Sequence, residues 1–138
     1  MRTWQKAALW IATGAYVLLL TTVSVLPSGD DAPGGWDRHL TPKTQNILHV
    51  PAYTVLAVLA TSCVWLAARP SLSGAAWTAA GCSVFGGLLE WVQTAVPGRM
   101  GSVADALLNL AGAAVGLLIL AAGRRFFPTA PSGARQTP

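Results

Sequence analysis

The sequence predicts an all-α fold, a four-helix transmembrane bundle with both termini in the cytoplasm (N-in, C-in). Three observations predict it. Only nine Lys/Arg and five Asp/Glu residues occur among 138, which is 10% against about 25% in soluble domains. Charge-free stretches cover residues 7–29, 44–68, 70–89 and 106–123, and a membrane crossing needs about 20 apolar residues. The basic residues gather beside the termini. This composition excludes a soluble enzyme, a disulfide-stapled secreted domain and a disordered tail.

The first two spans are bounded by charge and proline. We place the first at Ala7–Leu26, between Lys6 and Pro27. It is too long for the apolar region of a signal peptide, and no Ala-x-Ala-like cleavage site follows it. The second span is placed at Ile47–Ala68, because Arg69-Pro70 stops a helix there.

The last two spans complete a single four-helix transmembrane domain, residues 7–123. The third span is placed at Leu72–Val96, ahead of Pro97-Gly98, and the fourth at Val103–Gly123. Residues 124–138 are interpreted as a short disordered cytoplasmic tail, because residues 126–138 lack a helical pattern.

The distribution of basic residues predicts the orientation. Four spans place the termini on one side, together with six of the nine Lys/Arg residues: Arg2, Lys6, Arg69, Arg124, Arg125 and Arg135. Cytoplasmic loops carry the excess of Lys and Arg, so this side is predicted to be cytoplasmic. The same placement accounts for the net charge of +4 without nucleic-acid binding, which we exclude.

The polar residues of chemical interest are predicted to share one depth, within about 10 Å of the outer boundary at ~1.5 Å per helical residue. They come from all four spans and from the loop between the last two: Ser24, His49, Tyr53, Glu90, Gln93, Arg99, Ser102, Asp105 and Asn109. Helical spacing places them on narrow stripes, which run Gly86, Glu90, Gln93, Pro97 and Asp105, Asn109, Gly112, Gly116. Each stripe is narrow enough to face the bundle interior. The Gly112-x-x-x-Gly116 pair lets a neighbouring helix approach closely.

We interpret this cluster as a membrane-embedded anion site. Arg99 and the N-terminus of the fourth span suit a phosphate or pyrophosphate head group. His49, Glu90 and Asp105 are candidate catalytic acids and bases. The candidate binding residues are Arg99, Ser102, Tyr53, Gln93, Asn109 and Ser24. No metal or cofactor is expected, because His49, Glu90 and Asp105 come from three helices without diagnostic ligand spacing.

A purely structural interpretation stands beside the functional one. Glu90 in a span needs a partner, and Arg99 is the expected one. A Glu90–Arg99–Asp105 network would then pin two helices that are joined by a tight loop. Ser102-x-x-Asp105 is also a capping-box pattern, and interhelical hydrogen bonds would account for Asn109 and Gln93.

The polar motifs resemble the VanZ-like family of small bacterial membrane proteins. The resemblance spans roughly residues 10–122 and rests on His49-x-x-x-Tyr53, Glu90-x-x-Gln93 and Arg99-x-x-Ser102-x-x-Asp105-x-x-x-Asn109, with Ser24-x-x-Pro27 ahead of them. The resemblance implies four helices in the bacterial cytoplasmic membrane and a link to the cell envelope, since the family is named for a member associated with resistance to the glycopeptide teicoplanin. Gln45-Asn46 replace an Asp-Lys pair that many members carry, so any role of that pair in holding a substrate is in doubt.

Three functions remain open at this point. The cluster binds, or also modifies, a phosphate-bearing lipid or lipid-linked envelope precursor. Alternatively, the protein is a non-catalytic module that shields the cell surface from a glycopeptide antibiotic or other envelope stress. In the third alternative it is a structural membrane subunit that packs through its small-residue faces. The sequence leaves open whether it is an enzyme, and it is compatible with a homo-oligomer.

Overall fold

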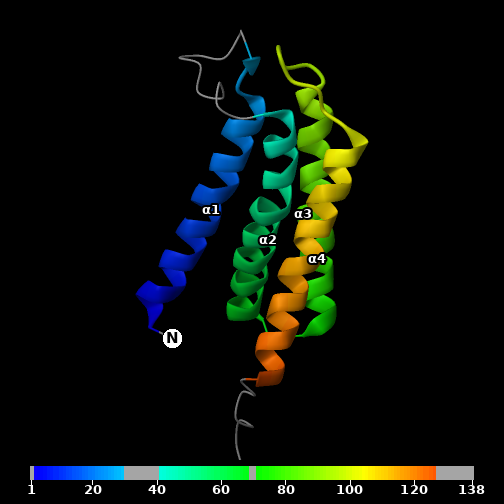
Figure 1. The fold of residues 1–138 in the computed structure, drawn as a ribbon. Coiled ribbons are helices and arrows are strands. Elements are labelled where there is room, and N and C mark those ends of the chain that lie inside the picture. The colour runs from blue at the N-terminus through cyan, green and yellow to red at the C-terminus, as the bar shows by residue number, and fades with distance from the viewer. Residues whose placement is uncertain (1, 30–40, 69–70, 127–138) are drawn as a thin grey trace, which may run out of the picture.

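A computed structural model describes residues 2–29, 41–68 and 71–126. Its four helices are α1 (Thr3–Val25), α2 (Pro42–Ala67), α3 (Leu72–Gln93) and α4 (Val103–Phe126). They alternate in direction, so that the end of α1, the start of α2, the end of α3 and the start of α4 meet at one end of the bundle (Figure 1). All four are long and apolar enough to cross a membrane. The predicted four-helix transmembrane fold is confirmed, whereas the N-in, C-in orientation stays a prediction.

Local capping chemistry moves two boundaries away from the predicted ones. The second helix begins at Pro42 rather than Ile47, because Thr41 caps it: its hydroxyl accepts a hydrogen bond from the Thr44 N–H at 3.2 Å. His49 therefore lies in the second turn of α2. The third helix ends at Gln93 rather than Val96, because the backbone bonds of residues 94–96 tighten to the i→i−3 pattern; Gly98, with a φ of 71°, then reverses the chain in the following loop.

The first helix begins earlier, and the fourth helix ends later, than the sequence predicts. The first helix begins at Thr3, ahead of the predicted Ala7. The fourth runs to Phe126, so residues 124–126 are helical and do not belong to a tail. The remainder of the predicted tail, residues 127–138, lies outside the described part of the chain.

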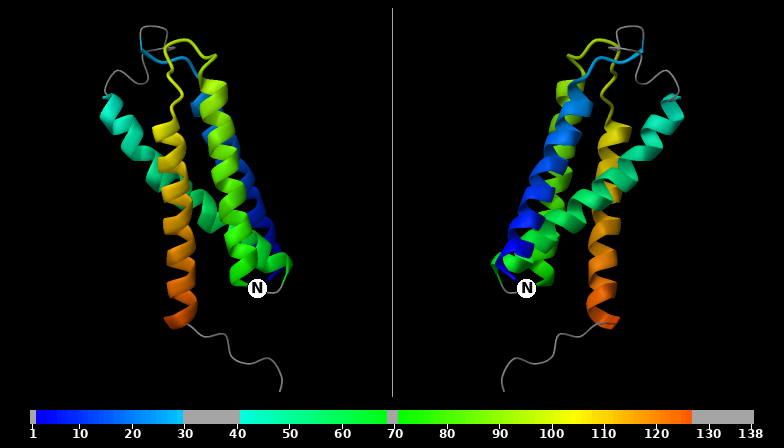
Figure 2. Two further views of the ribbon diagram at one scale, coloured as in Figure 1. Left: turned by 90° about the vertical axis from the view of Figure 1, so that its right-hand side faces the viewer. Right: turned by 90° about the vertical axis from the view of Figure 1, so that its left-hand side faces the viewer.

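The core forms where α2 meets α3 and α4. Tyr53, Leu56 and Ala57 of α2 pack with Ala79 and Cys82 of α3 and Ala113 of α4. Figure 2 shows α2 crossing the other helices obliquely. Within the described residues, α1 packs against α2 and α3 and not against α4. It is the outermost helix, and Thr13 is its one buried residue among those described.

Small residues bring α2 and α4 together, as the sequence predicts. A Cβ atom on Gly112 would collide with the Val50 carbonyl oxygen, and one on Gly116 would lie 2.8 Å from the Thr54 carbonyl oxygen. The Thr54 hydroxyl donates a hydrogen bond to the Gly112 carbonyl at 2.9 Å. Backbone contact of this kind needs glycine, so the Gly-x-x-x-Gly pair sets the separation of these two helices.

Candidate functional site

A cavity of about 130 Å³ lies at the end of the bundle where α1, α2 and α3 meet. Its polar lining consists of Ser24, Gln45, His49, Tyr53, Glu90, Gln93 and Arg99. Its apolar lining consists of Leu20 and Val23 of α1 and Leu48 and Ala52 of α2. The cavity thus brings together six of the nine predicted site residues.

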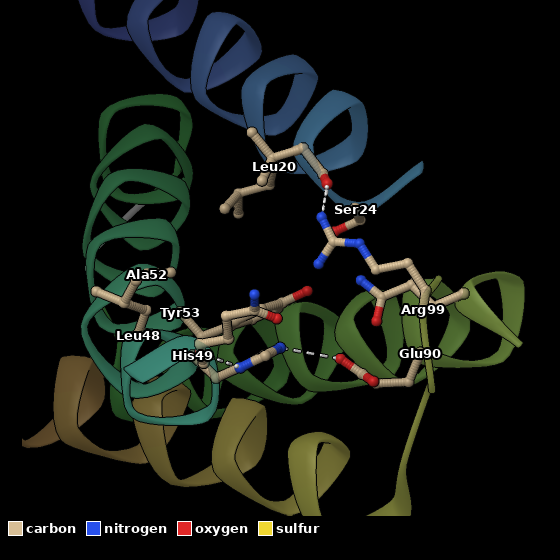
Figure 3. A pocket seen from close by; sticks show the side chains of 11 residues that line it. Leu20, Ser24, Leu48, His49, Ala52, Tyr53, Glu90 and Arg99 are labelled. Atoms are coloured by element: carbon tan, nitrogen blue, oxygen red, sulfur yellow. Dashed lines mark hydrogen bonds and ion pairs between the residues drawn. The ribbon is translucent and has the colours of Figure 1, made fainter. Parts of the chain in front are cut away.

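His49 and Glu90 join α2 to α3 at this cavity. The Nε2 atom of His49 lies 3.1 Å from the Glu90 Oε1 atom, and the Glu90 side chain is 6% exposed (Figure 3). Glu90 was expected to pair with Arg99. In the described part of the chain its side-chain partner is His49 instead, because the obliquely crossing α2 carries the imidazole to the end of α3.

The other hydrogen bonds of His49 show how many protons the pair holds. Its Nδ1 atom lies 3.1 Å from the Gln45 carbonyl oxygen and 3.3 Å from that of Asn46. Carbonyl oxygens only accept, so Nδ1 carries a hydrogen. One further proton must then lie between Nε2 and Glu90, because a lone pair facing a carboxylate would be repulsive. The pair is therefore neutral overall, and both ring nitrogens of His49 are engaged.

Glu90 also binds the start of α4. Its Oε2 atom accepts a hydrogen bond from the Ser102 backbone N–H at 3.2 Å. The Ser102 hydroxyl accepts from the Asp105 N–H at 3.0 Å and donates to the Asp105 Oδ2 atom at 2.6 Å. The predicted cap of the fourth helix is confirmed, with one difference. The N–H of the capping serine, which a capping box would pair with Asp105, is bound by Glu90 of the neighbouring helix.

Arg99 holds the end of α1. Its Nε atom donates to the Leu26 carbonyl oxygen at 3.1 Å, and its Nη2 atom donates to the Val23 carbonyl oxygen at 2.7 Å. Figure 3 shows the guanidinium group turned toward α1 beside Ser24. The last carbonyls of a helix lack partners inside the helix and carry partial negative charge, which a guanidinium group complements. Arg99 is thus both a wall of the cavity and a cap for α1.

Asn109, Ser102 and Asp105 do not line the cavity. Asn109 is 0% exposed and packs at the junction of three helices, beside Gly86 and Tyr53. Neither of its amide atoms has a hydrogen-bond partner among the described residues, so the predicted interhelical hydrogen bond is not formed. The two polar residues of the predicted α4 stripe therefore have different surroundings: Asp105 takes part in the helix cap, and Asn109 lies in the core.

Sequence reasoning missed Gln45 as a structural partner and missed the apolar wall. Gln45 orients His49 through its backbone carbonyl and lines the cavity. A signal was present, since Gln45, His49 and Tyr53 are spaced i, i+4, i+8 and so share one face of a helix. Leu48 and Ala52 lie on the adjoining face of the same helix, but nothing in an apolar span distinguishes them from residues that face lipid.

Within the described residues, no group of three or more His, Cys, Asp or Glu side chains could hold a metal ion. No curated protein and no solved structure matches the chain significantly. A family model described as VanZ/LLP1 matches residues 11–124, which cover nearly all of the four helices and every residue of the cavity. The chain therefore belongs to the VanZ/LLP1 family and is a multi-pass membrane protein with four spans.

Proposed function

We propose that this protein binds the phosphate group of a lipid or lipid-linked cell-envelope precursor in the cavity between α1, α2 and α3. The observation that carries the proposal is Arg99, whose guanidinium group lines a cavity at the end of a membrane bundle while its Nε and Nη2 atoms bind carbonyls of α1, so a bound phosphate would share this group with the cap of α1. Arg is well suited to bind phosphate, and the hydroxyl groups of Ser24 and Tyr53 supply further hydrogen-bond donors. The neutral His49–Glu90 pair adds no net negative charge that would repel an anion.

The size of the cavity limits the ligand. Sites that enclose drug-sized molecules measure roughly 300–1,000 Å³. A cavity of about 130 Å³ is suited to one small polar group. A glycopeptide antibiotic is far larger, so we assign the cavity to a head group, and tolerance of such an antibiotic would follow indirectly from lipid binding.

The hydrogen bonds favour binding over chemistry. Both ring nitrogens of His49 and both carboxylate oxygens of Glu90 already have partners. A general acid or base needs a proton or lone pair directed at the substrate, so catalysis would first require breaking one of these contacts. Catalysis remains the alternative, and conservative substitutions test it. If the site only binds lipid, the Glu90→Gln and His49→Gln variants keep the bound lipid in proteoliposomes. Neither these variants nor the wild type then convert the lipid to a product.

Lipid retained through purification tests the proposal directly. Ser24→Phe would fill the cavity from α1, whereas Thr22→Phe places the same side chain at an exposed position on that helix. We expect mass spectrometry to find a phosphate-bearing lipid on the wild type and on Thr22→Phe, and to find it depleted on Ser24→Phe with unchanged thermal stability. Equal lipid content in all three proteins would refute the proposed site.

A further inference from the structure

The exposed part of the cavity lining lies on α1 and α2. Among the described residues that line the cavity, Val23 of α1 and Leu48 of α2 are the two exposed ones, at 38% and 47%. Tyr53, Glu90 and Gln93 are buried and form its floor. The exposed lining, or rim, is therefore apolar and the buried lining is polar, with the half-buried Ser24, Gln45, His49 and Arg99 between them.

The depth of this rim suits the boundary between lipid head groups and acyl chains. Leu48 lies six residues after the start of α2 and Leu20 lies five residues before the end of α1. At ~1.5 Å per residue both lie about 8–9 Å from their helix ends. The head-group layer occupies about 5–8 Å of each leaflet, so helices that end at its outer edge would place Leu20 and Leu48 at the start of the hydrocarbon and Val23, two residues before the end of α1, among the head groups.

Polar contacts hold α1 to the rest of the bundle at two places along its length. Near the end of α1, Arg99 binds the Val23 and Leu26 carbonyls. Farther along the helix, the Tyr16 hydroxyl donates to the Ala52 carbonyl at 3.0 Å, and Thr13 hydrogen-bonds to Cys63 at 3.2 Å. Leu20 lies between these attachments, and the apolar side chain of Val23 lies at the first of them, so polar contacts lie on both sides of the apolar part of α1 that lines the cavity.

We infer that the cavity opens sideways into the bilayer, and that its ligand is a lipid whose phosphate enters between α1 and α2 while its aliphatic chain stays against Leu20, Val23 and Leu48. The inference rests on the proposed function and extends it from the head group to the whole molecule. A water-soluble phosphate compound would gain nothing from the apolar rim, so the lipid is the ligand that uses both parts of the site.

Photolabelling in nanodiscs of a phosphate-free galactolipid tests this route, with phosphatidic acid that carries a diazirine in its acyl chain as the probe. Leu48→Trp narrows the rim, and Ile47→Trp places the same side chain on the adjacent exposed residue outside the cavity lining. We expect labelling of wild type and Ile47→Trp at α1 and α2 residues of the rim. Labelling of Leu48→Trp should fall about tenfold, which corresponds to about 1.4 kcal/mol of binding.

The other outcomes separate the route from the proposed function. Unchanged labelling of Leu48→Trp, with loss in Ser24→Phe, would overturn sideways entry and leave the head-group site standing. Unchanged labelling of both variants would overturn the head-group site as well. Glycerol 3-phosphate should compete weakly with the probe. If it competes as strongly as unlabelled phosphatidic acid, the ligand enters from water and the inference is wrong.

Discussion

His49 and Glu90 act as one unit because a single proton links Nε2 to Oε1 across two helices. Removing His49 leaves the buried Glu90 without its match, which typically costs about 3 kcal/mol or more, whereas removing Glu90 leaves a partly exposed His49 that water can reach. We expect His49→Ala to lower the free energy of unfolding by about that amount and Glu90→Ala to lower it by less. The double variant should lose less than the sum, by about 1–3 kcal/mol. Thermal and denaturant unfolding in detergent measures both quantities, and strictly additive losses would contradict the pairing.

Gly86 shows a second effect at the scale of single residues, the close packing of Asn109. A Cβ atom on Gly86 would lie 2.7 Å from the Tyr53 ring and 2.8 Å from the Asn109 amide nitrogen, both in the packed core. Overpacking of this kind costs about 1–3 kcal/mol, so Gly86→Ala should lower the melting temperature. Gly87→Ala is the matched control, because nothing lies within 4 Å of its Cβ position. Equal melting temperatures for the two variants would contradict this packing.

At the scale of the element, α1 depends on its cap more than a buried helix would. In its apolar window only 6% of residues are buried, so contacts at its end make up a large share of what holds it. Hydrogen bonds to a charged group contribute about 1.5–3 kcal/mol each. We expect Arg99→Ala to loosen α1 and to make it more sensitive to protease, measured by limited proteolysis. Arg99→Lys should restore protection only in part, because one ammonium group does not reproduce the planar fork that reaches two carbonyls. Full protection of Arg99→Ala would show that the cap is dispensable.

At the scale of the whole molecule, the polar cavity is predicted to face the outer side of the membrane. Met100 lies at the cavity end of the bundle, is 87% exposed and follows α3, whereas the exposed Ser73 lies in the first turn of α3 at the opposite end. In a background with Cys63 and Cys82 replaced by Ala, an impermeant maleimide should label Met100→Cys in intact cells. Ser73→Cys should react only after lysis. The opposite pattern of labelling would reverse the predicted orientation.

The sequence predicted the features that depend on position along a helix. Four apolar stretches of membrane-spanning length predict four helices, and their alternation brings the polar residues to one end. The cap of α4 is local, since Ser102 and Asp105 lie three residues apart. The Gly112–Gly116 contact was also predictable, because small residues at that spacing favour a close approach between membrane helices.

The tertiary structure decided which of these residues meet. Rise per residue sets the depth of a side chain, but the rotation and tilt of each helix set its neighbours, and both depend on packing between helices. The oblique path of α2 brings His49, rather than Arg99, to Glu90. Arg99 instead binds carbonyl groups of a helix more than 70 residues earlier in the chain. Asn109, on the same stripe as Asp105, is enclosed by three helices. The sequence by itself therefore determined the membrane fold and the depth of the polar cluster, whereas lateral packing decided which of its residues form the cavity.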